Sequence, residues 1–291
     1  MPMDRRRFLG TGAAALLSSA FAWAAENRRI EKIGVQLYTV RDALQKDFEG
    51  TLAKVAAIGY REVEFAGYFD HPPREVRAAL DRHGLAAPAN HVDFDSFGEK
   101  WPQVIEASKI IGHEYIVNPD IGDELRKQPD GWKRAAETFN RAGEVSRKAG
   151  IQLAYHNHWF EFTPVNGKRP YDILLEECDP NVLKMELDLC WITVAGQDPR
   201  DYFKRFPGRF PLVHVKDMKR IPSPAAAAAI TVENDFYPDM ADVGSGVIDW
   251  KRIFAKSDEA GIRHYLIEHD DPKSPFDSIR VSYNYVQRLR F

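Results

Sequence analysis

The chain has 291 residues, of which 44% are hydrophobic, and its formal net charge is −3 at pH 7. This length fits two average domains or one α/β barrel, which runs to about 250 residues as a single unit. The nearly balanced charge excludes a protein whose main partner is a polyanion such as DNA. The two cysteines exclude a metal site built from sulfur alone and do not suggest a disulfide framework.

The N-terminus has the layout of an export signal. Three arginines, Arg5–Arg7, precede a short apolar run and then small residues, as in a secretory signal peptide. The apolar run is shorter than the ~20 residues that a membrane-spanning helix needs. The arginines, followed by Phe8-Leu9, resemble the twin-arginine motif, although Asp4 replaces the usual Ser or Thr. We therefore predict a twin-arginine signal peptide over residues 1–24, a mature chain over residues 25–291, a periplasmic location and no stable membrane anchor.

From residue 30 onward, short apolar runs alternate with amphipathic stretches of helical spacing, such as Trp132–Ala149. Helical stretches end at glycines, for example Gly84 and Gly112, and the next apolar run starts within a residue or two. Repeated strand–helix units imply parallel strands, and eight of them indicate a single-domain (β/α)₈ TIM barrel of the α/β class. The predicted strands are Ile33–Thr39, Glu62–Phe69, Ala86–Phe94, Tyr115–Asn118, Gln152–His158, Leu183–Trp191, Leu212–Lys216 and Tyr265–Asp270.

The absence of other motifs narrows the fold classes that fit the sequence. No G-x-G-x-x-G motif follows the first strand, and the sequence has no Walker A or G-x-S-x-G motif, which argues against a nucleotide-binding sheet and an α/β hydrolase. An insertion, Pro222–Met240, follows the seventh strand, so in a barrel it would hang over the active-site end. A lid and a plain surface loop are both consistent with it. Cys190 lies in the predicted sixth strand as a free buried thiol.

Ionisable residues gather at the predicted ends of the last four strands, where TIM barrels hold their active sites. Since side chains alternate along a strand, each strand presents such residues on one face. Buried carboxylates must be paired or bind a metal, and mixed histidine and carboxylate ligands suit Mn²⁺, Zn²⁺, Co²⁺ or Fe²⁺ better than Ca²⁺. Purely structural roles are the alternative, with Glu186 as an ion-pair partner of Lys216 or Lys184 and Asp270 at the start of a turn. The pairs that share a face are His156 with His158, Glu186 with Asp188, His214 with Lys216 and Glu268 with Asp270, and earlier strands add Glu64 and His91.

Over about residues 31 to 290 the sequence resembles the xylose isomerase-like TIM-barrel family, often called sugar phosphate isomerase/epimerase and related to endonuclease IV. In that family four side chains, usually Glu, Asp, His and Glu, hold one divalent metal ion. The resemblance implies Asp188, His214 and Glu268 as ligands of one Mn, Zn, Co or Mg ion. His156 replaces the usual first Glu, so the fourth ligand is either His156 or Glu186. The motifs that carry the resemblance are Gly34-Val-Gln-Leu-Tyr-Thr39, Gly59-Tyr-Arg-Glu-Val-Glu64, Tyr155-His-Asn-His158, Glu186-Leu-Asp188, His214-Val-Lys-Asp217, Gly244-Ser-Gly246 and Tyr265-Leu-Ile-Glu268.

The resemblance implies a reaction through an enediolate, which a Lewis-acidic metal stabilises. We expect His158 or Glu186 to be the base, with Glu268 as the alternative, and Lys216 to serve the catalytic proton transfers. We expect the substrate to be bound by Glu64, His91, Glu161 and an apolar wall at Trp191.

The predicted function is a metal-dependent isomerase or epimerase of a keto-sugar or inosose-like small molecule. Trp191 stands where sugar epimerases of the family carry a histidine, and the Tyr-His-Asn-His pattern resembles the branch that acts on 3-keto-glycosides and inososes. A lyase or dehydratase is therefore the alternative, and a non-catalytic sugar-binding protein is a more distant one. Export favours an unphosphorylated substrate. We expect no nucleic-acid partner, and the sequence leaves a homodimer open.

Overall fold

The computed structural model describes residues 28–228 and 239–291, and within them eight parallel strands form one closed barrel. The first and last strands of the barrel pair directly, with Ile33 opposite Tyr265, and this closes the ring. The predicted (β/α)₈ architecture is therefore confirmed. The barrel strands are β1 (Ile33–Gln36), β2 (Glu62–Phe65), β3 (Ala86–His91), β4 (Tyr115–Asn118), β5 (Gln152–His156), β6 (Leu183–Asp188), β7 (Leu212–Val215) and β10 (His264–Ile267).

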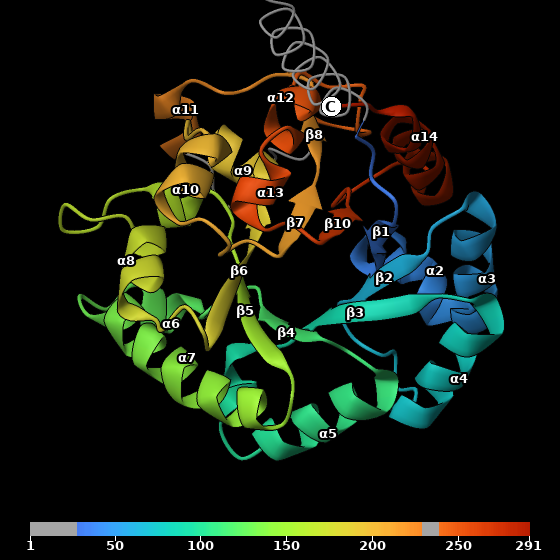
Figure 1. Cartoon of the computed structure of the whole chain (residues 1–291), viewed down its shortest axis with the longest axis horizontal. Coiled ribbons are helices and arrows are strands. Elements are labelled where there is room, and N and C mark those ends of the chain that lie inside the picture. Colours follow the sequence, from blue (N-terminus) through green and yellow to red (C-terminus); the bar gives the residue numbers. More distant parts are fainter. Residues whose placement is uncertain (1–27, 229–238) are drawn as a thin grey trace, which may run out of the picture.

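Helices surround the strands (Figure 1), and their apolar faces pack against the barrel. In α7, for example, Ala135, Phe139 and Ala142 are buried at helical spacing. Gly84 and Gly112 end α4 and α5 in the left-handed conformation, which glycine adopts without steric cost. The helices that follow the strands in chain order are α2 (Arg41–Lys46), α3 (Phe48–Ile58), α4 (Pro73–His83), α5 (Trp101–Ile111), α6 (Asp123–Arg126), α7 (Gly131–Lys148), α8 (Pro170–Glu177), α9 (Leu189–Val194), α10 (Pro199–Arg205), α11 (Pro224–Ala228), α12 (Trp250–Phe254), α13 (Ser257–Ala260) and α14 (Pro275–Arg288).

An apolar layer fills the middle of the barrel. Its buried residues include Ala89, Ala154, Leu212 and Leu266, which lie on four different strands. Each of them stands two positions before a polar residue, so the polar side chains share the same inward face one layer higher. Those polar residues are His91, His156, His214 and Glu268. The sequence alternation thus places a polar layer on an apolar floor at the carboxyl ends of the strands.

Several predicted strands end earlier than the apolar runs suggested. The sixth strand ends at Asp188, and the prediction that Cys190 lies in it is wrong, because Cys190 belongs to α9. The Asp188 carboxylate accepts hydrogen bonds from the backbone N–H groups of Cys190 and Trp191 and so starts a helix directly after the strand. The first strand ends likewise at Gln36, whose side-chain oxygen accepts from the backbone of Tyr38. Cys178 and Cys190 are both buried free thiols, as expected.

Four other predictions concern the fifth strand, the signal peptide, the insertion and membrane-spanning helices. The fifth strand ends at His156, two residues before its predicted end, so His158 lies in the following loop with its ring centroid 5.2 Å from that of His156. The predicted signal peptide lies outside the described residues, and the boundary after residue 24 stays a prediction. Within the insertion, Met240–Ala241 forms β9 and pairs with β8 (Asp217–Met218), while residues 229–238 lie outside the described part. In the described ranges, no helix combines the length and the apolar character needed to cross a bilayer.

Asp217 ties the end of β7 to the loop that contains Gly244-Ser-Gly246. Its carboxylate accepts hydrogen bonds from the backbone of Met218, Gly244, Gly246 and Ile248 and from the indole of Trp250. A Cβ on Gly246 would collide with the same carboxylate, which explains the glycine at this position.

We expect Asp217→Ala to lower the free energy of unfolding by about 3 kcal/mol or more, because it leaves several buried donors without an acceptor. Urea denaturation measures the change. The control is Asp249→Ala, which removes the helix cap on Arg252 and should cost only about 1 kcal/mol. Equal losses in the two variants would contradict the role assigned to Asp217.

Candidate active site

A cavity of about 270 Å³ opens at the carboxyl ends of the strands, above the apolar layer. It combines acidic, basic and aromatic side chains from both halves of the barrel, as expected for the catalytic end of this fold. Its lining contains five of the eleven predicted site residues, namely His91, His156, His158, Lys216 and Glu268. The other lining residues are Tyr38, Ala66, Val92, Asp93, Pro119 and Asp270.

Glu186 stands at the centre of a histidine cluster. Its Oε1 lies 2.9 Å from His91 Nε2, 3.1 Å from His156 Nδ1 and 2.9 Å from His214 Nε2. Burial alone would raise the pKa of Glu186, but the neighbouring His214 and His91 outweigh it and lower the pKa. Glu186 is therefore ionised, and it is fully buried beneath the cavity wall.

Two further carboxylates hold His214. Its Nδ1 lies 2.6 Å from Glu268 Oε2, and its Nε2 lies 2.7 Å from Glu64 Oε2. Gln36 donates to the same oxygen of Glu64 at 2.8 Å. Burial opposes the charged imidazole, yet the surrounding carboxylates raise the pKa of His214 well above its ordinary value. The His214 ring thus contacts three carboxylates, those of Glu64, Glu186 and Glu268.

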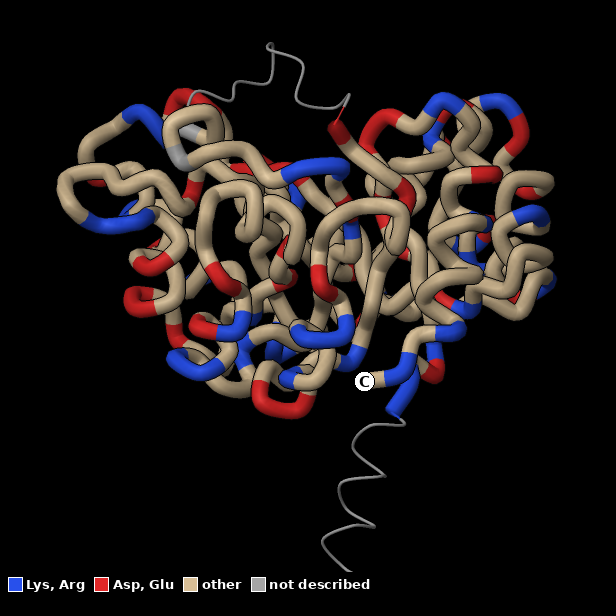
Figure 2. Tube along the Cα trace, turned by 90° about the horizontal axis from the view of Figure 1, so that it is seen from above, with Lys and Arg blue, Asp and Glu red and all other residues tan. Residues whose placement is uncertain are grey.

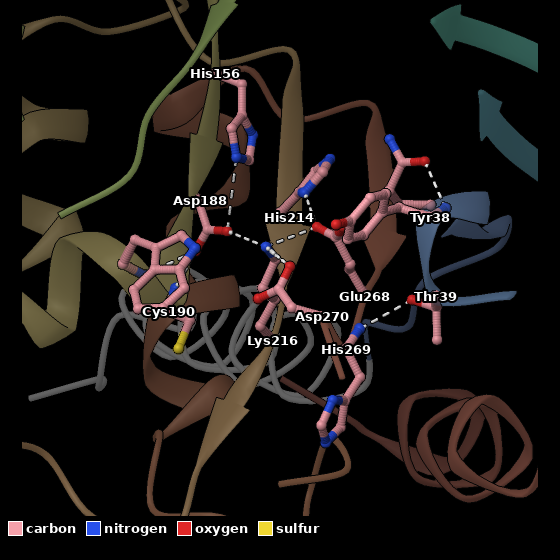
Figure 3. A network of polar contacts seen from close by, with 12 residues as sticks. Tyr38, Thr39, His156, Asp188, Cys190, His214, Lys216, Glu268, His269 and Asp270 are labelled. Atoms are coloured by element: carbon pink, nitrogen blue, oxygen red, sulfur yellow. Dashed lines mark hydrogen bonds and ion pairs between the residues drawn. The ribbon is translucent and has the colours of Figure 1, made fainter. Parts of the chain in front are cut away.

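Lys216 forms the second centre of charge (Figure 3). Its Nζ lies 2.7 Å from Glu268 Oε2, 3.0 Å from Asp270 Oδ1 and 3.2 Å from Asp188 Oδ2. Burial would lower the pKa of Lys216, but the three carboxylates raise it well above its ordinary value, so the side chain is an ammonium group. Burial also raises the pKa of Asp270 to about 6, against the effect of Lys216.

The described side chains offer two groupings that could hold a metal ion, and both contain His214. The first joins it to Asp188 and Glu268, and the second joins it to His91, His156 and Glu186. Three of the four predicted ligands therefore fall in one group. His156 and Glu186, the alternatives for the fourth position, both fall in the other.

The charges and unpaired atoms of this region fit a divalent cation. Five carboxylates, those of Glu64, Glu186, Asp188, Glu268 and Asp270, outnumber the three basic groups whose pKa values they raise, His91, His214 and Lys216, in a largely buried volume. Within the described residues, Glu64 Oε1 and Glu186 Oε2 are buried and accept no hydrogen bond, and Asp188 Oδ2 is buried with the Lys216 ammonium at 3.2 Å. Such oxygens are the ligands that a hard or borderline divalent ion binds.

The environment of His156 indicates how it would serve as a ligand. Its Nδ1 faces Glu186 at 3.1 Å, and its Nε2 lies 3.9 Å from Asp188 Oδ2. A carboxylate that accepts the Nδ1 proton leaves the Nε2 lone pair for a metal, which is the usual arrangement of a metal-binding histidine. Two ligand atoms of one tetrahedral ion lie about 3–3.5 Å apart, near the observed spacing.

His158 lies on a turn that Glu161 holds in place. Glu161 accepts a hydrogen bond from the hydroxyl of Tyr155 at 2.7 Å and one from the backbone N–H of His158 at 2.9 Å. The His158 ring stacks on Phe160 and lines the cavity, and its buried Nδ1 has no hydrogen-bond partner among the described residues. Burial lowers the pKa of His158 to about 3, so the ring is neutral at pH 7.

Three predicted substrate-binding residues lie behind the cavity surface. Glu64 and Glu161 are fully buried, and Trp191 is 2% exposed. Trp191 packs against Trp159 with ring centroids 4.9 Å apart, and Lys216 Nζ lies 5.7 Å from the Trp191 ring. In this geometry these residues support the side chains that line the cavity, and only His91 of the predicted substrate-binding set lines it directly.

Sequence reasoning missed Tyr38 and Asp93 as lining residues and gave Asp270 no assigned role in the site. Tyr38 follows the first strand in the Gly34–Thr39 motif, whose position at a strand end was the available signal. Glu268 and Asp270 both follow the end of β10, and their spacing of two residues was also visible in the sequence.

We expect Glu161→Gln to flatten the pH dependence of stability. Burial raises the pKa of Glu161 from 4.5 to about 8, so the folded chain binds this proton more tightly than the unfolded chain does. The resulting contribution is complete below about pH 4.5 and is lost as pH rises through about 8, by up to about 1.4 kcal/mol per pH unit. Glutamine keeps both contacts, because the Tyr155 hydroxyl can accept as well as donate. Urea unfolding of both proteins at pH 5 to 8 tests this, and parallel curves would contradict it.

Figure 2 colours the charged residues along the Cα trace. Lys and Arg are interspersed with Asp and Glu over the trace (Figure 2). The expectation that nucleic acid is not a partner stays a prediction.

Comparison with known proteins places this geometry in a family. The family model described as "Xylose isomerase-like TIM barrel" matches residues 52–284. Inosose dehydratase of Geobacillus kaustophilus is 23% identical over 269 residues, which cover 82% of this chain and 86% of that protein. A sugar phosphate isomerase/epimerase from Parabacteroides distasonis has a crystal structure that superposes with a TM-score of 0.74 at 27% identity, covering 88% of this chain and 93% of that one.

A second solved structure shares the fold. The IOLI protein, solved with a zinc atom bound, superposes with a TM-score of 0.68 at 16% identity and covers 89% of this chain and 99% of that one. The match of the family model extends over all the strands from β3 to β10 and thus over nearly the whole polar layer. The chain belongs to the xylose isomerase-like TIM barrel family.

Proposed function

We propose that the chain is a metal-dependent lyase that removes water from an inosose or a similar unphosphorylated keto-polyol. The relatives support the prediction of an enzyme that acts on carbohydrates, and the inosose dehydratases among them support elimination over isomerisation. The observation that carries the proposal is one cavity lined by Glu268 and His156 of the proposed ligands, by the neutral His158 and by the Lys216 ammonium. The other two proposed ligands are buried and contact this lining, His214 through Glu268 and Asp188 through Lys216.

Asp188, His214 and Glu268 would hold the ion, with His156 Nε2 as the fourth ligand and Glu186 as the partner of His156 Nδ1. When bound, a divalent ion supplies Lewis acidity toward a carbonyl oxygen. The chain itself supplies the rest of the environment. His91, also held by Glu186, lines the cavity beside His156 and would bind a substrate hydroxyl.

In the proposed reaction, His158 and Lys216 carry out the proton transfers. His158 accepts the proton from the carbon next to the carbonyl, and the electron pair of the broken C–H bond moves onto the carbonyl oxygen as an enolate. As this pair returns, the bond to the hydroxyl on the next carbon breaks. Lys216 donates a proton to the departing oxygen, so that water leaves, and His158 holds the proton taken from carbon.

Epimerisation or isomerisation is the second candidate, because it shares the first proton removal. The likeness to the Parabacteroides protein favours it. Among the described residues, however, no arginine lines the cavity, and Lys216 is already surrounded by carboxylates. This composition suits a neutral polyol better than a sugar phosphate.

NMR in D₂O tests the proposal. Inosose is incubated with the purified chain and one equivalent of Mn²⁺, Co²⁺ or Zn²⁺, with chelator-treated chain as the control. Deuterium incorporation with release of water supports the lyase, and incorporation with return of a stereoisomer supports the epimerase. Binding without any exchange would refute both and favour a non-catalytic sugar-binding protein.

We further propose that the chain is exported to the periplasm by the twin-arginine route. Arg5 and Arg6, followed by an apolar run, support this. Replacing both by lysine should retain the full-length chain in the cytoplasm, whereas unchanged fractionation would refute the proposal.

A further inference from the structure

We propose that the Lys216 ammonium and the divalent ion compete for Asp188 and Glu268, and that Asp270 retains Lys216 when the ion binds. This inference rests on the metal-dependent function proposed above. It assigns Lys216 a role in metal loading and gives Asp270 a role in the site.

The competition follows from shared oxygens. Lys216 Nζ lies 3.2 Å from Asp188 Oδ2 and 2.7 Å from Glu268 Oε2, so it bridges the two carboxylates. The same two residues, with His214, form one of the metal-binding groups. An ion bound between them would lie close to the ammonium in a buried region, where repulsion between cations is weakly screened.

The ammonium also explains how so acidic a cluster is stable before a metal arrives. Asp188 is fully buried and Glu268 is 5% exposed. Buried carboxylates without a counter-charge would be strongly destabilising. Lys216 provides that counter-charge, and its side chain is only 3% exposed.

Asp270 offers the displaced ammonium a second position. It already contacts Lys216 through Oδ1 at 3.0 Å, while its buried Oδ2 has no hydrogen-bond partner among the described residues. Neither metal-binding group includes Asp270. Figure 3 shows Asp188, Glu268 and Asp270 on different sides of the Lys216 amine, so a change of rotamer can shift Nζ toward Asp270 without leaving the cavity.

This displacement would link metal binding to catalytic competence. Lys216 and Asp270 both line the cavity. Before loading, the Lys216 protons are held by Asp188 and Glu268. After loading, two of these contacts are lost and the ammonium can donate to a substrate oxygen. The proton donor is thus released by the ion that the reaction needs.

Metal binding to the purified, chelator-treated chain tests the inference. Mn²⁺ or Zn²⁺ is titrated calorimetrically into wild type, Lys216→Met and Asp270→Asn at one pH. We expect Lys216→Met to bind the ion at least tenfold more tightly, because no ammonium must be displaced. We expect Asp270→Asn to bind it at least tenfold more weakly, because the displaced ammonium lacks its carboxylate. The matched controls are Lys184→Met, whose amine contacts Gly208 away from the site, and Asp271→Asn; both should bind as wild type does.

Thermal unfolding adds a second readout. Metal-free Lys216→Met should melt below metal-free wild type, and saturating metal should restore more of its stability than it adds to wild type. If Lys216→Met does not fold without metal, Lys216→Gln takes its place. A metal-loaded crystal structure of wild type should have Nζ within hydrogen-bond distance of Asp270 and no longer between Asp188 and Glu268.

The outcomes separate this inference from the proposed function. Equal metal affinity in wild type and Lys216→Met would overturn the competition and leave the lyase proposal standing. Tighter binding by Lys216→Met without proton exchange by wild type would support the competition and refute the lyase. No binding to any of the variants would overturn both.

Discussion

His214→Ala should abolish metal binding and lower turnover by about a thousandfold or more. The residue belongs to both metal-binding groups and contacts Glu64, Glu186 and Glu268 at 2.7, 2.9 and 2.6 Å. Its removal would therefore take a ligand from both metal-binding groups and leave Glu64 and Glu268 without their nearest imidazole contact. Metal analysis of the purified protein and the D₂O assay measure the two effects.

The control for this variant is His71→Ala. His71 stacks on Phe48 outside the cavity, so its loss should leave the metal content unchanged. A His214→Ala protein that folds and keeps one bound ion would contradict the proposed site. His156→Ala and Glu186→Gln then separate the two candidates for the fourth ligand. Loss of the ion is expected in His156→Ala, whereas Glu186→Gln should bind it with an affinity reduced by about 10–100-fold.

The second large effect is expected for His158→Asn, which should lower kcat by about 10²–10⁴-fold while metal content is unchanged. The ring lines the cavity, is neutral at pH 7 and presents a buried nitrogen without a partner in the described chain. Asparagine preserves polarity but cannot accept the proton. The rate of deuterium incorporation next to the carbonyl isolates this step from the loss of water.

His269→Asn is the matched control, since His269 follows β10 and does not line the cavity. Its kcat should stay within a factor of a few of wild type. If His158→Asn exchanges deuterium as fast as wild type, the base is Glu186 or Glu268. Glu186→Gln and Glu268→Gln would then be compared at saturating metal.

The repeat of apolar runs and glycine-ended helices was enough to predict the barrel, because both reflect local backbone preferences that tertiary contacts reinforce. Strand ends were less predictable. At Asp188 and Gln36 a side chain accepts hydrogen bonds from the next backbone N–H groups and ends the strand inside an apolar run. A hydropathy pattern does not register such a bond, and this is why Cys190 was assigned to a strand.

The alternation of side chains along the strands was enough to predict the polar layer. It did not predict which side chains contact one another within that layer. Alternation placed Glu186 near the site, and Glu161 stood just beyond the predicted fifth strand. Neither position showed that Glu186 lies among three histidines or that Glu161 lies beneath the cavity wall. Those outcomes depend on side-chain directions across strands far apart in sequence. Asp270 shows the same limit, because its contact with Lys216 joins residues 54 positions apart.

The apolar layer beneath the polar one also determines from which end of the barrel small molecules reach the cavity. Ala89, Ala154, Leu212 and Leu266 are fully buried and close the barrel below the cavity. In the described residues the cavity therefore opens only toward the carboxyl ends of the strands, and substrate and product of the proposed reaction would both pass through that end. Product must depart before the next substrate can enter, so accumulated product should act as a competitive inhibitor whose strength follows its affinity for the empty cavity.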